Sequence, residues 1–212
     1  MMQRLSLVIL ILFSFIFSFS QKGNYQEGFI IKKNGDTIPV SIVKRNWKKQ
    51  PEEIKIKTST KDSIIYPEAI KGFIIPSLEL EYVSTEIRLA KFNDKFQEAT
   101  TIKDPELYEA KYLLLKRIYK GRFDLYLFFD KLSRKRFFVE SQDNFTELYS
   151  HYYVVIYDHP VTYLEKKYEF VLKILMTPCR SLFSIIENIR LDEEQIIQVF
   201  KMYDKCLDSK GE

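Results

Sequence analysis

GFIIKKNGDTIPVSIV, residues 28–43, has the alternating pattern of a β-hairpin. Apolar residues recur at every second position on both sides of Asn34-Gly35, a dipeptide that tolerates the positive φ angles of a tight turn. We therefore expect strands over 28–33 and 37–44. Because Pro39 has no amide hydrogen, its strand is expected to lie at a sheet edge or to contain a bulge.

Further runs with the two-residue period of strands follow this hairpin. The expected strands are 54–57, 64–66, 70–75, 78–83, 112–119, 123–129, 136–139 and 152–157. Residues 84–111 have no clear period, and Pro105 is a candidate start of a short helix there. The sequon Asn144-Phe145-Thr146 is expected in a loop.

The last third of the chain changes to the period of helices. Its first apolar stripe runs from Leu164 to Leu175, and Thr177-Pro178 has the pattern of a cap followed by a proline in the first helical turn. Asp192, with Gln195 three residues on, resembles a capping box. We expect an α+β protein with an antiparallel β-rich domain over 21–160 and a helical tail over 161–212 packed on it.

Residues 1–20, MMQRLSLVILILFSFIFSFS, have the layout of a secretory signal peptide. A basic residue precedes an apolar core, and the small residues Ser18 and Ser20 precede an expected cut before Gln21. The alternative is a retained membrane anchor, but a spanning helix needs about 20 apolar residues, and this stretch is shorter. We therefore expect an exported protein of the periplasm or outer membrane, with no transmembrane segment after cleavage.

The two cysteines lie in the expected helical tail. Cys179 begins the second helix and Cys206 ends the third, so an antiparallel pair of helices brings them opposite each other. An exported location favours a disulfide, which contributes about 3 kcal/mol by closing a loop of this size. The alternative is two separate buried thiols; a catalytic pair is not favoured because the C-x-x-C spacing is absent.

Composition and motifs exclude several kinds of site. The 212 residues include 33 basic and 29 acidic ones, a net charge of +4 that is too small to indicate nucleic-acid binding. The sequence has no glycine-rich phosphate loop, no H-E-x-x-H and no G-x-S-x-G. His151 and His159 have no metal-binding spacing and are expected to be ordinary surface or turn residues. Glu79 with Glu81 resembles an ordinary polar strand face. We therefore expect no catalytic residues, no metal and no cofactor.

Two basic clusters contain aromatic residues. In the first, Trp47 is surrounded by basic side chains: Lys44, Arg45, Lys48 and Lys49. In the second, residues 134–136 precede Phe137. Basic residues beside an exposed aromatic ring can bind acidic glycans or nucleic acid, and export removes most nucleic-acid partners. We predict a binding patch at the first cluster for an envelope protein or an acidic glycan; the alternative is a solvated hairpin rim.

The runs 28–47, 64–75 and 112–129, together with the two cysteines, resemble a group of uncharacterised exported proteins from Bacteroidetes-type bacteria. This group has no established activity, so the resemblance assigns no functional residue. It does imply O-glycosylation in the periplasm at Asp followed by Ser or Thr and an apolar residue. Asp36-Thr37-Ile38 and Asp62-Ser63-Ile64 match that pattern, and we predict a glycan on Thr37 or Ser63.

These observations favour an exported, non-catalytic binding or accessory protein of the cell envelope. One alternative is a carrier that encloses an apolar, lipid-like ligand in a curved sheet. A second is a hydrolase whose site is assembled from scattered residues, for which Asp158 and His159 are the best candidates.

Overall fold

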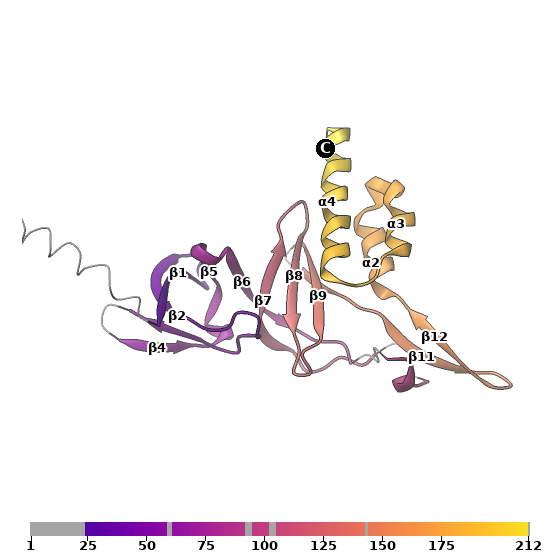
Figure 1. Ribbon diagram of the computed structural model, residues 1–212, viewed down its shortest axis with the longest axis horizontal. Coiled ribbons are helices and arrows are strands. Elements are labelled where there is room, and N and C mark those ends of the chain that lie inside the picture. The colour runs from indigo at the N-terminus through magenta and orange to yellow at the C-terminus, as the bar shows by residue number, and fades with distance from the viewer. Residues whose placement is uncertain (1–23, 59–60, 92–94, 102–104, 143, 212) are drawn as a thin grey trace, which may run out of the picture.

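The computed structural model describes residues 24–58, 61–91, 95–101, 105–142 and 144–211. One antiparallel sheet has ten strands in the order β10-β9-β8-β7-β6-β5-β1-β2-β3-β4, and β11 and β12 form a separate hairpin. Helices follow at the C-terminal end and lie together on one side of the sheet (Figure 1). The expected α+β class is therefore confirmed, whereas the expected signal peptide lies outside the described residues.

The strands are short and follow one another closely along the chain. The ten strands of the large sheet are β1 (Tyr25–Lys32), β2 (Thr37–Val43), β3 (Ile54–Lys57), β4 (Asp62–Ile65), β5 (Ile70–Ile75), β6 (Leu80–Ile87), β7 (Lys111–Tyr119), β8 (Asp124–Phe129), β9 (Lys135–Ser141) and β10 (Asn144–Leu148). The separate hairpin consists of β11 (His151–Ile156) and β12 (Pro160–Glu165). Short 3-10 turns, η1 (Pro67–Ala69), η2 (Pro76–Leu78) and η3 (Phe96–Glu98), connect neighbouring strands.

The first hairpin forms as the sequence predicts, but with a different turn. Gly35 N donates to the Lys32 carbonyl at 2.9 Å, and Lys32 N donates to the Asp36 carbonyl at 2.8 Å. Of the Asn-Gly pair, Gly35 alone has a positive φ, 93°. The connection is thus a three-residue loop with its glycine in the last position, rather than a two-residue turn with two positive φ angles.

Pro39 lies in β2, which is an internal strand of the sheet and not an edge strand. It pairs with Phe29 of β1, and the described register of β2 with β3 covers Ser41 and Ile42. The expectation of an edge strand is therefore wrong.

Three expectations along the chain were wrong. No helix starts at Pro105; instead Leu107 forms an isolated bridge with Ala90. The sequon at Asn144 lies in β10 rather than in a loop. Residues 160–165 are a strand, so the helical region begins at Lys167 and not at residue 161.

In the N-terminal half of the sheet, β1 to β6, one face curls over its own apolar core. Its buried residues are Ile30, Val40, Ile42, Ile54, Ile56, Ile70, Phe73, Ile75, Leu80 and Tyr82, with Leu114 of β7. Close approach of β5 and β6 helps the curl, because a Cβ atom on Gly72 would lie 2.2 Å from the Tyr82 carbonyl oxygen. Only glycine fits this position without movement of the backbone.

In the C-terminal half, β7 to β10, helices cover the same face. They are α2 (Lys167–Leu175), the 3-10 turn η4 (Thr177–Leu182), α3 (Phe183–Asn188) and α4 (Glu193–Lys210). Apolar residues of β8 and β9, such as Leu125 and Phe137, pack against Leu172 and Phe200 from the helices. The opposite face has a smaller core that includes Leu115, and residues near Leu89 contribute to it.

The helices are capped and covalently joined largely as the sequence predicts. The Asp192 side chain accepts from Gln195 N at 3.0 Å, which confirms the predicted cap of α4. Cys179 in η4 and Cys206 in α4 form a disulfide with their Cα atoms 6.3 Å apart. Thr177 does not cap a new helix, because its hydroxyl donates back to the carbonyls at the end of α2.

The hairpin of β11 and β12 extends away from the body of the molecule (Figure 1). Midway along β11, Val154 N donates to the Thr100 carbonyl at 2.7 Å. Ile156 and Tyr157 at its tip are exposed. None of the helices in the described ranges is long and apolar enough to cross a membrane.

Candidate ligand-binding site

A side-chain amide separates β7 from β8, the first two strands of the C-terminal half, beside its junction with the N-terminal half. The register pairs Lys116 with Leu127, so Leu114 and Phe129 would be the next partners along the ladder. Instead, the Gln50 amide nitrogen donates to the Leu114 carbonyl at 2.6 Å, and Phe129 N donates to the Gln50 amide oxygen at 3.2 Å. Gln50 thus satisfies both backbone groups while it holds the two strands apart.

A pocket of about 600 Å³ opens where these strands diverge, and we call it the junction pocket. Its wall comes from the loop before β3, from η1, from residues 89 and 108, and from the facing ends of β7, β8 and β9. Leu89, Leu113 and Phe128 supply apolar lining, and Phe128 is buried. This volume lies within the range of pockets that bind small molecules.

Three tyrosines line the junction pocket, one from the segment before η1 and two from the segment that enters β7. Tyr66 is 51% exposed, Tyr108 45% and Tyr112 38%. Lys33 lies over the ring of Tyr112 with its ammonium 4.2 Å from the centroid, and Lys91 lies 5.0 Å from that of Tyr108. These cation–π contacts restrict where the two rings can turn, so the aromatic groups are partly fixed before any ligand binds.

Two ion pairs hold the wall of the pocket in place. Arg136, 2% exposed, donates from Nε to Glu147 at 2.5 Å and from its terminal nitrogen to the Ala90 carbonyl at 2.6 Å. Glu147 also accepts from Ala90 N at 3.0 Å, so the ion pair binds both backbone polar groups of one residue, Ala90. Asp130 accepts from the Arg134 guanidinium at 2.7 Å in the β8–β9 turn.

The Asp130 carboxylate also accepts from the backbone amides of Leu132 and Arg134, each at 2.9 Å. Burial by itself raises the pKa of Asp130, but these hydrogen bonds and the Arg134 charge together lower it below its usual range. Asp130 is therefore ionised in the folded protein at neutral pH and keeps its loop in one conformation.

Other charged side chains of the lining stand at the rim. Four of them are exposed and form no salt bridge within the described part of the chain: Glu52, Glu68, Lys111 and Lys131. These two carboxylates and two ammonium groups have a net charge of zero. The rim thus offers acceptors and donors to a ligand without a strong field of either sign.

The predicted patch around Trp47 lies on the same loop as Gln50. Lys44, Lys48 and Lys49 are exposed, but Trp47 is half-buried, with its ring 5.6 Å from that of Phe73. The tryptophan is thus part of the N-terminal core rather than an exposed platform. Ligand binding at this patch stays a prediction.

Arg45 of the same patch has a structural role in its loop. Its guanidinium donates to the carbonyls of Glu53 at 3.3 Å and Gln50 at 3.4 Å and lies beside the Trp47 ring. Burial raises the pKa of nearby Tyr82 to about 12, although the Arg45 charge opposes this shift. Arg45 thereby supports the loop that carries Gln50.

The basic side chains of the second cluster, residues 134–136, all form ion pairs within the molecule. Besides the buried Arg136 and the paired Arg134, Lys135 binds Glu193 of α4 at 2.7 Å. The carboxylates that neutralise it come from the adjoining turn, from β10 and from a helix. Its charges therefore connect elements of the fold.

A separate polar cluster surrounds Arg117 on β7. Its guanidinium binds Glu81 at 2.6 Å and Asp124 at 3.1 Å, and it donates to the Tyr126 hydroxyl, which in turn donates to Glu140 at 2.5 Å. Burial, and then the hydrogen bond to Glu140, raise the pKa of Tyr126 well above its usual range. Glu81 thus pairs with Arg117, while Glu79 precedes β6 in a left-handed conformation.

The histidines do not meet. His151 is buried at the start of β11, where its ring stacks with that of Tyr153, and His159 is exposed in the turn after that strand with Asp158. The expectation that both are surface residues is thus wrong for His151. In the residues that the structure covers, no group of three or more metal-ligating side chains is placed to hold an ion.

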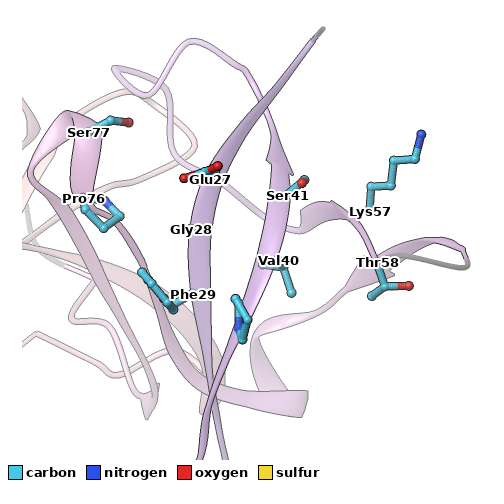
Figure 2. A pocket seen from close by; sticks show the side chains of 10 residues that line it. Glu27, Gly28, Phe29, Val40, Ser41, Lys57, Thr58, Pro76 and Ser77 are labelled. Atoms are coloured by element: carbon cyan, nitrogen blue, oxygen red, sulfur yellow. The ribbon is translucent and has the colours of Figure 1, made fainter. Parts of the chain in front are cut away.

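A second hollow, of about 790 Å³, lies over β1 and β2. Figure 2 shows its lining side chains spread over open strands, with Lys57 extending away from them. Gly28 contributes no side chain to this surface. The junction pocket, by contrast, is enclosed by five segments and has polar groups fixed by hydrogen bonds.

The two predicted glycosylation positions differ in accessibility. Thr37 is exposed at the first residue of β2, whereas Ser63 is half-buried in β4, where it pairs with Ile56. The geometry favours Thr37 over Ser63 as an enzyme's target. Modification of either residue stays a prediction.

The junction pocket is a site that reasoning from the sequence missed. Gln50 contacts Leu114 and Phe129, which lie 64 and 79 positions further along the chain, and no local sequence pattern indicates such contacts. Tyr108 and Tyr112 are close in the chain, but nothing in the spacing joins them to Tyr66, which precedes η1. Comparison of the chain with protein-family profiles, curated proteins and solved structures gives no match.

Proposed function

We propose that this protein is an exported, non-catalytic binding or accessory protein of the cell envelope, and that it contacts its ligand or partner through the junction pocket. The observation that carries the proposal is the Gln50 insertion between β7 and β8. A continuous ladder would satisfy the same backbone groups without a long side chain, so the sequence uses Gln50 to keep an opening.

Export is supported by the Cys179–Cys206 disulfide, because such bonds persist in oxidising compartments. The expected mature protein begins at Gln21. Fractionation of native cells and N-terminal sequencing test this part: we expect the protein outside the cytoplasm with Gln21 at its start. A cytoplasmic protein that retains residues 1–20 would contradict it.

Site-specific photo-cross-linking in native cells tests the binding role. A photoreactive phenylalanine analogue replaces Tyr66 in the pocket or, as a control, Phe170 on α2, which is similarly exposed at 60%. We expect a reproducible cross-linked species from position 66 and none from position 170. The same species from both positions, or none from position 66, would contradict binding through the pocket.

The basic patch belongs to the proposal as a separate surface for an acidic envelope glycan or protein. Its exposed ammonium groups, those of Lys44, Lys48 and Lys49, lie next to Gln50 in the chain. Substitution of all three by glutamine is expected to weaken salt-sensitive association with isolated envelopes and to leave the cross-link from position 66 in place. Unchanged association would remove the patch from the proposal.

A further inference from the structure

We propose that the junction pocket binds a short, uncharged oligosaccharide. This inference names the ligand class of the proposed binding function and rests on it. It follows from three features of the pocket: aromatic rings that stand at separate points of the wall, polar groups that have no partner among the described residues, and a balance of charge at the rim.

The aromatic rings provide stacking surfaces. A sugar ring has an apolar face of C–H groups, and an exposed tyrosine can contact this face while its hydroxyl remains near water. Tyr66 comes from the segment before η1, Tyr108 and Tyr112 come from the segment that enters β7, and all three are about half exposed. Separate rings of this kind suit a ligand with several ring units better than a single flat molecule.

The polar groups match hydroxyls. Within the described chain, the hydroxyls of these tyrosines have no hydrogen-bond partner, and neither do the rim carboxylates and ammonium groups. Carboxylates accept from sugar hydroxyls, whereas ammonium groups donate to them. A polyhydroxylated ligand satisfies both kinds of group at once.

The charge balance separates the proposal from its rivals. Glu52 and Glu68 offset Lys111 and Lys131, so the rim does not select an anion. A fatty acyl chain would lie against charged side chains of both signs and would desolvate them without replacing their hydrogen bonds. An uncharged saccharide avoids both costs.

Saturation-transfer NMR and calorimetry on the full mature protein, with its disulfide intact, test the proposal. The probes are cellotriose, maltotriose and N,N′,N″-triacetylchitotriose, with trigalacturonate and oleate as the acidic and lipid-like comparisons. We expect at least one of the three uncharged trisaccharides to bind with a Kd below about 10 mM. If none of them binds, the proposal is overturned; stronger binding of trigalacturonate or oleate also overturns it.

Variants locate the binding site. Tyr66→Ala is expected to raise the Kd of the trisaccharide that binds by about ten-fold, because it removes a ring on which the sugar stacks. Tyr157→Ala, at the exposed tip of the β11–β12 hairpin, is the matched control and is expected to leave the Kd unchanged. Equal effects of the two substitutions would place binding elsewhere. Thermal unfolding of each variant checks that the exposed substitution leaves the fold intact.

The outcomes distinguish this inference from the function on which it rests. A cross-link at position 66 in cells, with no trisaccharide binding, overturns the oligosaccharide and leaves the binding role standing. Absence of both the cross-link and binding by any probe overturns both proposals.

Discussion

The two halves of the ten-stranded sheet cover the same face in different ways. The N-terminal half curls over a core rich in isoleucine, with Trp47, Phe73 and Tyr82 packed together at its side. The C-terminal half is richer in phenylalanine and leucine, and a layer of helices covers it. The N-terminal half packs over its own core with the help of the close strand approach at Gly72, whereas the C-terminal half uses a second layer.

The halves also differ in how they use polar groups. Among the described residues, the buried polar ones are Ser84, Arg136 and His151, all from β6 onward. The C-terminal half thus carries the buried charge, and its ion pairs connect β9, β10 and α4 to their surroundings. The junction pocket lies at the boundary, where Gln50 from the first half enters the strands of the second.

The largest expected effect comes from breaking the buried ion pair of the C-terminal half. Arg136→Met leaves the Glu147 carboxylate buried without its cation, so we expect the free energy of unfolding to fall by about 3–5 kcal/mol in urea titrations. Lys135→Met is the control: its pair with Glu193 is exposed, and its loss is expected to cost less than about 1 kcal/mol. Similar losses in both variants would contradict a larger contribution of the buried Arg136 pair to the free energy of unfolding.

Removal of the disulfide tests whether the helical layer is a separate source of stability. The double variant Cys179→Ser and Cys206→Ser is expected to lose about 3 kcal/mol, because the unfolded chain gains the freedom of a long loop. Helical circular dichroism is expected to disappear at lower urea than in the parent protein. Trp47 fluorescence, which reports on the N-terminal core, is expected to shift less. Equal shifts of both signals would show that the halves unfold as one unit.

A smaller effect is expected inside the N-terminal core. Ile42→Val removes one buried methylene from a residue that is 1% exposed, and we expect a loss of about 1 kcal/mol, read from Trp47 fluorescence. Ile64→Val makes the same chemical change at a residue of β4 that is 50% exposed. Its effect is expected to be close to zero, and a loss equal to that of Ile42→Val would contradict the assigned core.

The smallest effect concerns Asp130 at the junction pocket, and it depends on pH. The pKa of this carboxyl is lowered in the folded protein, so its ionisation stabilises the fold above the unfolded-state pKa, and this contribution is lost as pH falls through the folded value. Asp130→Asn is expected to cost about 0.5–1 kcal/mol at pH 7 through the lost Arg134 pair. The difference from the parent protein is expected to vanish in acid; a constant difference across pH would contradict this cause.

Sequence patterns located most strands, and their failures have a common cause. The first hairpin, β3, β5 and β7 to β9 carry regular alternation or long apolar runs, and they form where expected. β10 and β12 were missed because each has a weak pattern of its own. In β12, Leu164 fits a helix stripe with Tyr168, but pairing with Tyr152 of β11 makes it a strand residue.

The candidate site shows even more strongly the difference between what local patterns predict and what long-range contacts decide. The Trp47 cluster was recognised in the sequence because its charged residues are neighbours in the chain. In the structure, however, the tryptophan ring packs against the N-terminal core. Gln50, three residues later, has no sequence signal, yet its two hydrogen bonds shape the pocket. A run of charged residues can be recognised in the sequence itself. The insertion of Gln50 between β7 and β8 can be recognised only when the positions of both strands are known.

Local patterns alone were enough for the α+β class, the first hairpin, the cap at Asp192 and the pairing of Cys179 with Cys206, because each depends on residues close together or on elements of known length. The order of ten strands, the burial of Arg136 and the junction pocket depend on contacts between residues far apart in the chain. Many arrangements share the same local periodicity, and packing of the apolar faces, together with hydrogen bonding of buried polar groups such as Arg136, selects among them.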